Sequence, residues 1–454
     1  MNSELIESQP PQLVRERKMQ LKPFRAFRFD PAVVGDATAC IAPPYDVING
    51  DQQEQLYQKS KYNIVRIIKG HTNPSDNEDD NQYTRAADYL AEWIKQGALK
   101  QDEDKSIYAY VQDFKANGDR FQRYSFIALG KLEEFGKVVK PHEEIFEKPL
   151  IDRLNLKKST SADFGLVFML YEDPQRIADN IITEAADREP LIDLVDEQEV
   201  RHRLFAISAQ KDIEQIVNMM SDKSCIIADG HHRYTTGLTY SKENGNPAAK
   251  YQMFAFANTY HEGLLILATH RLVGYLDNFD PDEFINSLSD KFRISEYKFS
   301  SVETKQQARQ KMLDDMKAEH EKDNNAIGIY STTNAFYVAV LKDKNLMNEV
   351  AHDMSTHSKL LDLTVLHKLI LEGLLGIDKE RLARGENIQY LKDTPSAIDE
   401  SIAQVDAGQK QAAFFMNPVK IKELKAVTDT GERMPQKATY FFPKVYSGLT
   451  IYKF

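Results

Sequence analysis

One short segment of the sequence joins an apolar run directly to acidic, glycine, histidine and arginine residues. Residues 224–234 read Ser-Cys-Ile-Ile-Ala-Asp-Gly-His-His-Arg-Tyr. The apolar part predicts a strand, Gly230 permits a sharp turn, and the residues that follow predict a helix. Unpaired backbone N–H groups and the positive end of the helix dipole suit such a helix start to a phosphate or a similar anion.

Each side chain of this turn has a chemical use in phosphate binding or transfer. Arg233 could contact phosphate oxygens in a bidentate manner, and His231 or His232 could donate a proton or a hydrogen bond near neutral pH. Asp229 could hold a divalent cation or orient one of the histidines. The alternative is structural: Asp229 caps the helix and both histidines are solvated. The His-His-Arg that follows Asp-Gly favours the functional interpretation.

A second polar segment, residues 140–153, reads Lys-Pro-His-Glu-Glu-Ile-Phe-Glu-Lys-Pro-Leu-Ile-Asp-Arg. Glu143 or Glu144 could act as a general base toward a hydroxyl group. Phenylalanine at position 146, where a zincin motif needs its second histidine, excludes that kind of metal site. A solvated, salt-bridged loop explains the segment at least as well when it is taken alone. In the functional interpretation, phosphate charge would be neutralised by its basic residues His142, Lys148 and Arg153.

Two weaker candidates would form the wall of a substrate site. Tyr45 and Asp46 follow a Pro-Pro pair, which predicts a rigid turn. His270 and Arg271 follow the apolar run 263–268, and polar residues at strand ends often face a crevice. A plain turn and an ordinary surface position are the alternatives.

The elements around these residues predict an α/β fold, with α+β as the alternative. The runs 106–114 and 121–129 flank Asn-Gly-Asp and predict a β-hairpin. Residues 63–69 are rich in isoleucine and valine and predict a strand, whereas the leucine spacing in 356–375 predicts a half-buried helix.

The predicted organisation has a polar leader, a core that carries the motifs and a more helical C-terminal region. We expect the leader at residues 1–20, a mixed-sheet α/β core at 21–276 and a C-terminal α+β region at 277–454. The length of 454 residues suits two or three domains of roughly 100–200 residues each.

Composition limits the partners and the compartment. The net charge is −11 and no dense Lys/Arg cluster occurs, which disfavours nucleic acid as the main partner. The longest apolar runs are far shorter than the roughly 18–20 residues of a membrane span. The N-terminus lacks the apolar core of a signal peptide, and two cysteines cannot form a disulfide framework. A cytoplasmic protein is therefore expected, and the sequence carries no signal of its oligomeric state.

Several of these motifs, taken together and in order, resemble the prokaryotic "domain of unknown function 1015" family. The resemblance extends from about Lys22 to Ile451, nearly the whole chain, and departs from the family pattern at Ala438, where serine is expected. The residues that carry it are 42–47, 142–154, 228–234, 269–272 and 434–444.

The Asp-Gly-His-His-Arg element also looks like the signature turn of the ParB/sulfiredoxin-like superfamily. In that superfamily a Gly-x-x-Arg turn at a helix start binds nucleotide phosphates, and a kinase that phosphorylates free serine carries a similar Asp-Gly-His-x-Arg turn. Sulfiredoxin has its catalytic cysteine where this chain has His231, which argues against sulfinic-acid repair. The resemblance thus implies a ParB/sulfiredoxin-like core and a link to serine metabolism.

These observations lead to one main functional hypothesis and two alternatives. The main hypothesis is a phosphoryl-transfer enzyme, kinase or phosphatase, acting on a small hydroxylated metabolite such as serine or phosphoserine. Gly230 to Arg233 would hold the phosphate, Asp229 would help to bind Mg²⁺, and a nucleotide or pyrophosphate would be the donor. One alternative is a non-catalytic nucleotide-binding switch of the ParB type; the other, DNA binding, is disfavoured by the acidity.

Overall fold

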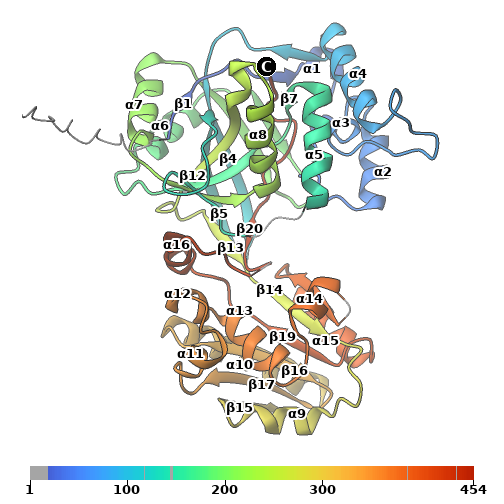
Figure 1. Ribbon diagram of the computed structural model, residues 1–454, viewed down its shortest axis with the longest axis vertical. Helices are drawn as coiled ribbons and strands as arrows, with labels where there is room; N and C mark the ends of the chain where they lie inside the picture. The colour runs from blue at the N-terminus through green and yellow to red at the C-terminus, as the bar shows by residue number, and fades with distance from the viewer. Residues whose placement is uncertain (1–18, 117, 144–146, 386, 436) are drawn as a thin grey trace, which may run out of the picture.

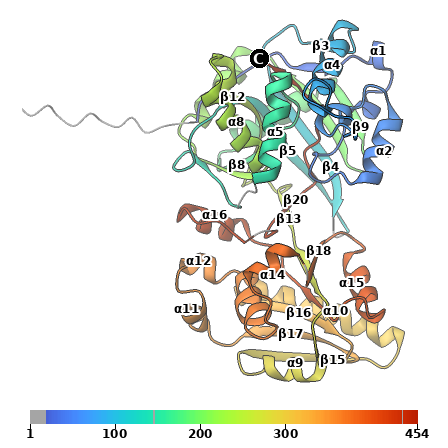
Figure 2. The ribbon, with the colours of Figure 1, turned by 45° about the vertical axis from the view of Figure 1, so that its right-hand side comes forward.

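The computed structural model describes residues 19–116, 118–143, 147–385, 387–435 and 437–454. Two lobes lie one above the other in Figure 1, and they stay separate after the rotation shown in Figure 2. Each lobe is built around its own sheet, with helices packed against it. The fold is mixed α/β, as the alternation of short helices and strands predicts.

The upper lobe contains a mixed sheet to which nine strands of the described residues contribute. Most neighbours are antiparallel, but β11 runs parallel to β6, and β12 runs parallel to β8. The strands in order are β6 (Val139–Lys140), β11 (Cys225–Asp229), β8 (Val167–Tyr171), β12 (Tyr251–Asn258), β5 (Asp119–Lys131), β4 (Ile107–Ala116), β10 (Arg201–Ile207) and β9 (Ile192–Val195), with β1 (Leu21–Lys22) paired to β5.

The predicted β-hairpin is confirmed as β4 and β5, the longest strands of this sheet. Ala116 pairs with Asp119 at the turn, and Gly118 has a φ of 86°, which suits a tight hairpin connection. Successive residues of β4 alternate between two buried cores, since Ile107 belongs to one and Tyr108 to the other. The sheet is therefore covered on both faces.

The helices of the upper lobe surround the sheet in Figure 1. Helices α6 and α7 pack on one face of the sheet. Helices α2, α3 and α4 form an N-terminal cluster with its own buried core, and α5 packs beside α8. Their bounds are α1 (Pro31–Val34), η1 (Ala37–Cys40), α2 (Gly50–Lys59), α3 (Val65–Ile68), α4 (Gln82–Lys95), α5 (Glu147–Thr160), α6 (Ile177–Ala186), α7 (Gln210–Met220), α8 (His231–Glu243) and η2 (Pro247–Lys250), with the short strands β2 (Phe27–Phe29), β3 (Leu99–Gln101) and β7 (Ala162–Asp163) between them.

The predicted strand at 63–69 is wrong, because this segment forms the short helix α3. Ile64, Val65, Ile67 and Ile68 are all buried, and an apolar run without alternation does not distinguish a buried strand from a buried helical turn. The side chain of Asn63 decides the local geometry. Its Oδ1 accepts the backbone N–H of Val65 at 2.9 Å and so favours a helical start.

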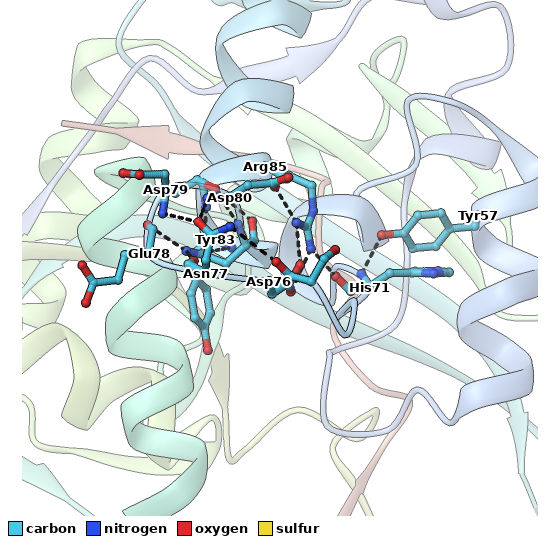
Figure 3. Close-up of polar contacts among 12 residues, drawn as sticks. Tyr57, His71, Asp76, Asn77, Glu78, Asp79, Asp80, Tyr83 and Arg85 are labelled. Carbon is cyan, nitrogen blue, oxygen red and sulfur yellow. Dashed lines mark hydrogen bonds and ion pairs between the residues drawn. The ribbon is translucent and has the colours of Figure 1, made fainter.

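An acidic loop precedes α4 and is held by the helix that follows it (Figure 3). Arg85 contacts Asp76 at 2.8 Å and Asp80 at 2.6 Å through Nη1, and its Nη2 donates to the carbonyl of His71 at 2.8 Å. The Asn77 side chain accepts two further backbone N–H groups of the loop. Two of the acidic side chains of the loop, Asp76 and Asp80, are therefore paired with a cation of α4.

The lower lobe contains an antiparallel sheet of six strands within the described residues. Its first strand starts at residue 269, ahead of the expected change of region at 277. The strands in order are β15 (Phe292–Lys298), β17 (Ala335–Leu341), β16 (Ala326–Ser331), β19 (Ala412–Phe415), β14 (Thr269–Val273) and β18 (Ile388–Lys392).

The helices of the lower lobe are mostly short. The segment 356–375, predicted as one helix, is divided into α12, α13 and a π-helix, although its leucines are largely buried as expected. No described helix is long and apolar enough to cross a membrane. The bounds are α9 (Pro281–Leu288), α10 (Val302–Glu321), α11 (Leu346–Val350), α12 (Thr356–Lys359), α13 (Asp362–Val365), the π-helix η3 (Leu366–Glu372), α14 (Lys379–Arg384) and α15 (Ala397–Asp406).

The chain returns to the upper lobe through α16 (Ile421–Asp429) and a C-terminal strap, residues 434–435 and 437–454. In the strap, β20 (Tyr440–Phe442) pairs with β13 (Leu265–Leu267), and β21 (Tyr452–Lys453) pairs with β7. Met434 donates its N–H to the carbonyl of His142 at 2.8 Å. The strap therefore passes along the region where the two lobes meet.

Candidate functional site

The Asp-Gly-His-His-Arg segment forms the strand–turn–helix that its sequence predicts. Strand β11 ends at Asp229, α8 begins at His231, and Gly230 between them has φ 92° and ψ 30°. A Cβ on Gly230 would approach the guanidinium of Arg233 to about 3.0 Å, so both conformation and space favour glycine. The N-cap residue Gly230 has no side chain that could accept from the first N–H groups of α8.

This turn opens onto a cleft of about 560 Å³ between the two lobes. Its described wall comes from the Tyr45 turn, Lys69 after α3, Glu143 and Pro149 around the start of α5, the end of β11 with the start of α8, strands β14 and β18 of the lower lobe, and the strap. The lining includes Tyr45, Asp46, Glu143, Asp229, Gly230, His231, His232, Arg233, Lys392, Lys437, Tyr440 and Lys444.

The cleft carries an excess of positive charge in a protein whose net charge is −11. Its described lining holds five Lys and Arg side chains against three Asp and Glu side chains. No carboxylate of the described residues lies within ion-pair distance of Lys392 or Lys437. The Lys392 ammonium instead lies 4.5 Å from the centre of the Tyr440 ring. A cleft of one sign concentrates ligands of the opposite sign, here anions.

Asp229 lies between two of these cations. Its Oδ1 is 3.2 Å from Lys444 Nζ, and its Oδ2 is 3.0 Å from Arg233 Nη2. Burial alone would raise the pKa of the Asp229 carboxyl, but Lys444 and Arg233 outweigh it and hold that pKa well below its usual range. Asp229 is therefore ionised at neutral pH and orients both cations at the floor of the turn.

Arg233 is nearly buried and fixed from two sides. Besides the bond to Asp229, its Nη1 donates to the carbonyl of Leu166 on the neighbouring part of the sheet. Arg233 thus ties the start of α8 to the approach of β8 while it lines the cleft. The geometry gives this arginine a structural contact that its sequence position does not reveal.

The two histidines of the turn differ in their surroundings. His231 is buried, and its Nε2 accepts the backbone N–H of His142 at 3.2 Å, so its proton lies on Nδ1. Burial, followed by the nearby His142, lowers the pKa of His231 well below its usual value. His232 is half-buried, and burial lowers its pKa as well. Both are neutral at pH 7, and His232 presents more of its ring to the cleft.

The segment that precedes α5 contributes only in part to the same wall. Glu143 lines the cleft and accepts the backbone N–H of Lys437 at 3.2 Å. His142 lies beneath the surface, because its Nδ1 contacts the carbonyl of Ile227 and its Nε2 contacts Thr439 Oγ1 at 2.8 Å. Both ring nitrogens of His142 are thus engaged by protein groups. Glu144 and the side chain of Lys148 lie outside the described residues.

Tyr45 and Asp46 also line the cleft, and Arg153 lies against Tyr45 outside the cleft lining. The Arg153 guanidinium is 4.0 Å from the centre of the Tyr45 ring and donates to the carbonyl of Ile68 at 2.7 Å. Burial raises the pKa of the Tyr45 hydroxyl to about 12. Asp46 is exposed on the cleft lining. Tyr45 and Asp46 therefore line the cleft, and Arg153 packs against the Tyr45 ring.

His270 and Arg271 lie behind the wall rather than on it. They follow strand β13, as the sequence predicts, but they lie within the next strand, β14, and both are about 2% exposed. Arg271 donates to the carbonyls of Thr269 and Lys437, and Met416 donates its N–H to His270 Nδ1 at 3.2 Å. Thr269 is the residue of this strand that lines the cleft.

A buried arginine of the upper lobe holds the part of the strap that carries Lys444. Arg123 donates to the carbonyls of Phe442 at 3.3 Å and Pro443 at 2.6 Å, and Gln112 donates to the carbonyl of Lys444 at 3.0 Å. Burial lowers the pKa of Arg123 to about 10. The Lys444 ammonium is thereby presented toward Asp229 from a rigid backbone.

Sequence reasoning missed the basic side chains from the C-terminal half, Lys392, Lys437 and Lys444. Burial in the cleft lowers the pKa of Lys392, with Lys444 and Lys437 adding to the effect. The segment that contains Lys437 and Lys444 supports the family resemblance but was given no functional role. Two lysines beside a cluster of aromatic residues were the signal in this segment that could have predicted a binding role.

A metal site of protein ligands alone is not formed by the described residues. No three His, Cys, Asp or Glu side chains among them come close enough together to hold an ion. Asp229 is paired with two cations, and Asp46 and Glu143 are the other carboxylates on the described lining. Such a set fits Mg²⁺ only when ligand phosphates complete its coordination, which is the usual mode for this ion.

Comparison with known proteins identifies a family. The model of the family described as protein of unknown function (DUF1015) matches residues 21–364. None of the curated proteins matches the sequence. A conserved hypothetical protein from Pyrococcus furiosus is similar in structure, with 12% identity, a TM-score of 0.31, and coverage of 68% of this chain and 88% of that one.

Two other solved structures show a likeness of the same order. A free serine kinase in complex with AMP has 11% identity and a TM-score of 0.32, covering 67% of this chain and 83% of the kinase. SbnI with a C-terminal truncation, from Staphylococcus aureus, has 11% identity and a TM-score of 0.32, covering 72% and 87%. Likeness at this level indicates no activity for this chain.

Proposed function

Because this chain belongs to the family described as protein of unknown function (DUF1015), a description that assigns no activity, we propose its function from the cleft. We propose a phosphoryl-transfer enzyme that acts on a small hydroxylated metabolite, with serine and phosphoserine as the first compounds to test. The observation that carries the proposal is the convergence of the helix start at Gly230 with lysines from the lower lobe and the strap on one cleft.

The side chains of the cleft suit different parts of such a reaction. Lys392, Lys437 and Lys444 would neutralise the phosphate oxygens, together with the N–H groups at the start of α8. Glu143 would accept the proton of the attacking hydroxyl, and neutral His232 would donate a hydrogen bond or act as the alternative base. Arg233 would contact the phosphate oxygens from the floor of the turn, where Asp229 orients the Arg233 guanidinium.

The proposal includes a nucleotide or pyrophosphate as donor and Mg²⁺ as its counterion. The ion would bind phosphate oxygens together with carboxylates of the cleft, Asp229 among them, and would supply charge neutralisation. From its sequence, we also propose that the turn at Gly230 is related to the phosphate-binding turn of the ParB/sulfiredoxin-like superfamily. We further propose that the protein works in the cytoplasm.

The proposal is tested by anion binding and by turnover. Isothermal calorimetry with ATP, ADP, pyrophosphate and phosphoserine, each with and without Mg²⁺, should find a ligand. Lys392→Gln and Lys437→Gln should each weaken it about fivefold to thirtyfold, from the loss of roughly 1–2 kcal/mol per charge-assisted contact. Lys95→Gln and Lys317→Gln remove exposed lysines of α4 and α10 outside the cleft and are matched controls.

Equal affinity in the cleft variants and the control variants would contradict the proposed site.

A second function, a nucleotide-binding switch, is favoured by the position of the cleft between two lobes, where a ligand contacts both. Phosphorus NMR of the same mixtures separates the two functions. An enzyme transfers or releases phosphate, whereas a switch binds nucleotide and leaves it unchanged.

A further inference from the structure

Tyr440 of the strap lies beside the ammonium groups of two cleft lysines that come from different parts of the chain. The centre of its ring is 4.5 Å from Lys392 Nζ and 4.8 Å from Lys444 Nζ. Lys392 belongs to β18 of the lower lobe, whereas Lys444 follows β20 in the strap. The ring is 8% exposed and lines the cleft together with both lysines. One aromatic side chain thus contacts two cations of the proposed anion site.

The ring holds these cations differently from a carboxylate. A carboxylate would cancel the charge of a lysine that it holds, whereas an aromatic face attracts an ammonium group and carries no net charge. Lys444 shares the carboxylate of Asp229 with Arg233. Lys392 has no carboxylate of the described residues within ion-pair distance. Tyr440 therefore fixes two ammonium groups without cancelling their charge.

The charge of the cleft is not balanced by the described protein groups that line it. Five Lys and Arg side chains face three Asp and Glu side chains, an excess of two positive charges. The two histidines of the lining add no charge near pH 7, because burial lowers the pKa of both. Two further cations, Arg123 and Arg271, are buried against the strap and donate to its carbonyl groups. A ligand with one negative charge would leave this excess only partly offset.

We propose that Tyr440 is a specificity-determining residue, which holds Lys392 and Lys444 so that the cleft prefers a group with two negative charges to a group with one. The preferred group is a phosphate monoester, whose second pKa is about 6, so that it is dianionic at pH 8. Phosphate diesters and carboxylates carry a single charge and should bind more weakly. This inference rests on the proposed function, since it names the substrate class of the same anion site.

The experiment is a phosphorus NMR titration of the full chain at pH 8 and low salt, with methyl phosphate and dimethyl phosphate as probes. Both probes present a tetrahedral phosphate, and they differ by one methyl group and one negative charge. Methyl phosphate should bind at least about tenfold more tightly, the effect of one additional charge-assisted hydrogen bond. A smaller ratio, or no binding of methyl phosphate, would overturn the preference without any substitution of Tyr440.

Two substitutions separate the ring of Tyr440 from its hydroxyl group. Tyr440→Phe keeps a ring beside both lysines and should retain the preference. Tyr440→Leu removes the ring, and the affinity for methyl phosphate should fall about five- to thirtyfold, whereas the affinity for dimethyl phosphate should fall less. A general loss of structure would lower both affinities alike. The ratio of the two affinities is therefore the readout that reports on the pair of lysines.

Tyr251→Leu is the matched control. Lys22 lies 3.9 Å from the centre of the Tyr251 ring at the start of β12, outside the described lining of the cleft. Tyr251→Leu should leave the affinities for both probes unchanged. Equal ratios in Tyr440→Leu and Tyr251→Leu would overturn the role of Tyr440, as would loss of the preference in Tyr440→Phe.

The same probes separate this inference from the proposed function. A preference for methyl phosphate that depends on the Tyr440 ring, in a protein that transfers no phosphate, would retain the inference and refute the enzyme. Phosphate transfer by a protein that binds methyl phosphate and dimethyl phosphate equally would retain the enzyme and refute the inference.

Discussion

Arg233→Ala is the substitution for which the structure changes the expectation most. An arginine that only held phosphate would be dispensable for folding. In the structure the guanidinium pairs with Asp229 at 3.0 Å and donates to the carbonyl of Leu166, with the two side chains of the pair 10% and 19% exposed. Arg233→Ala should therefore lower the free energy of unfolding as well as the affinity for anions.

The size of the stability loss follows from the two bonds that Arg233 makes and from the partner that Asp229 keeps when Arg233 is removed. A hydrogen bond that involves a charged group contributes about 1.5–3 kcal/mol, and breaking a buried ion pair costs about 3–5 kcal/mol. Asp229 keeps Lys444 as a partner, which reduces the penalty. We expect a loss of about 2–4 kcal/mol in the free energy of unfolding, and a fall in anion affinity of about ten- to a hundredfold.

Urea unfolding followed by circular dichroism measures the first quantity, and calorimetry measures the second. The control is Arg201→Ala, whose partner is Asp193 and whose pair is exposed, at 50% and 34%. That exposed pair should contribute no more than about 1 kcal/mol. Equal stability losses in the two variants would refute the structural role of Arg233. Unchanged stability with weakened anion binding would leave it as a phosphate contact alone.

Three further substitutions test other parts of the site. The pKa of Asp229 is depressed, so its stabilising contribution is present above about pH 4 and lost as the pH falls toward the folded value. Lys444→Met removes its strongest cationic partner and should flatten this acid-side decline in stability, measured as melting temperature against pH. Gly237→Ala should destabilise by about 1–2 kcal/mol, against the usual helix preference, because its Cβ would lie 2.0 Å from Gln252 Oε1; a rise in urea midpoint would contradict that packing. Glu143→Gln should abolish phosphate transfer while calorimetry shows ligand binding retained, since the amide cannot accept a proton, and full turnover would exclude Glu143 as the base.

Local signals in the sequence were sufficient for the strand–turn–helix at Gly230 and for the β4–β5 hairpin. Both depend on glycine at a left-handed position and on the period of apolar residues, which neighbouring residues determine. The same reasoning failed at 63–69, because a fully apolar run has no period and Asn63 turned it into a helix.

The tertiary structure alone decided which polar residues share the cleft. His142 and Arg271 have the residue types of a binding site, yet both are bonded to backbone groups beneath the wall. Lys392 and Lys444 are distant in sequence from the Gly230 turn and reach it because β18 and the strap return there. Long-range pairing of strands depends on the whole core, and no short pattern records it. The sequence therefore determined the local shape of the strand–turn–helix at Gly230, and the return of the C-terminal chain determined the charges that face it.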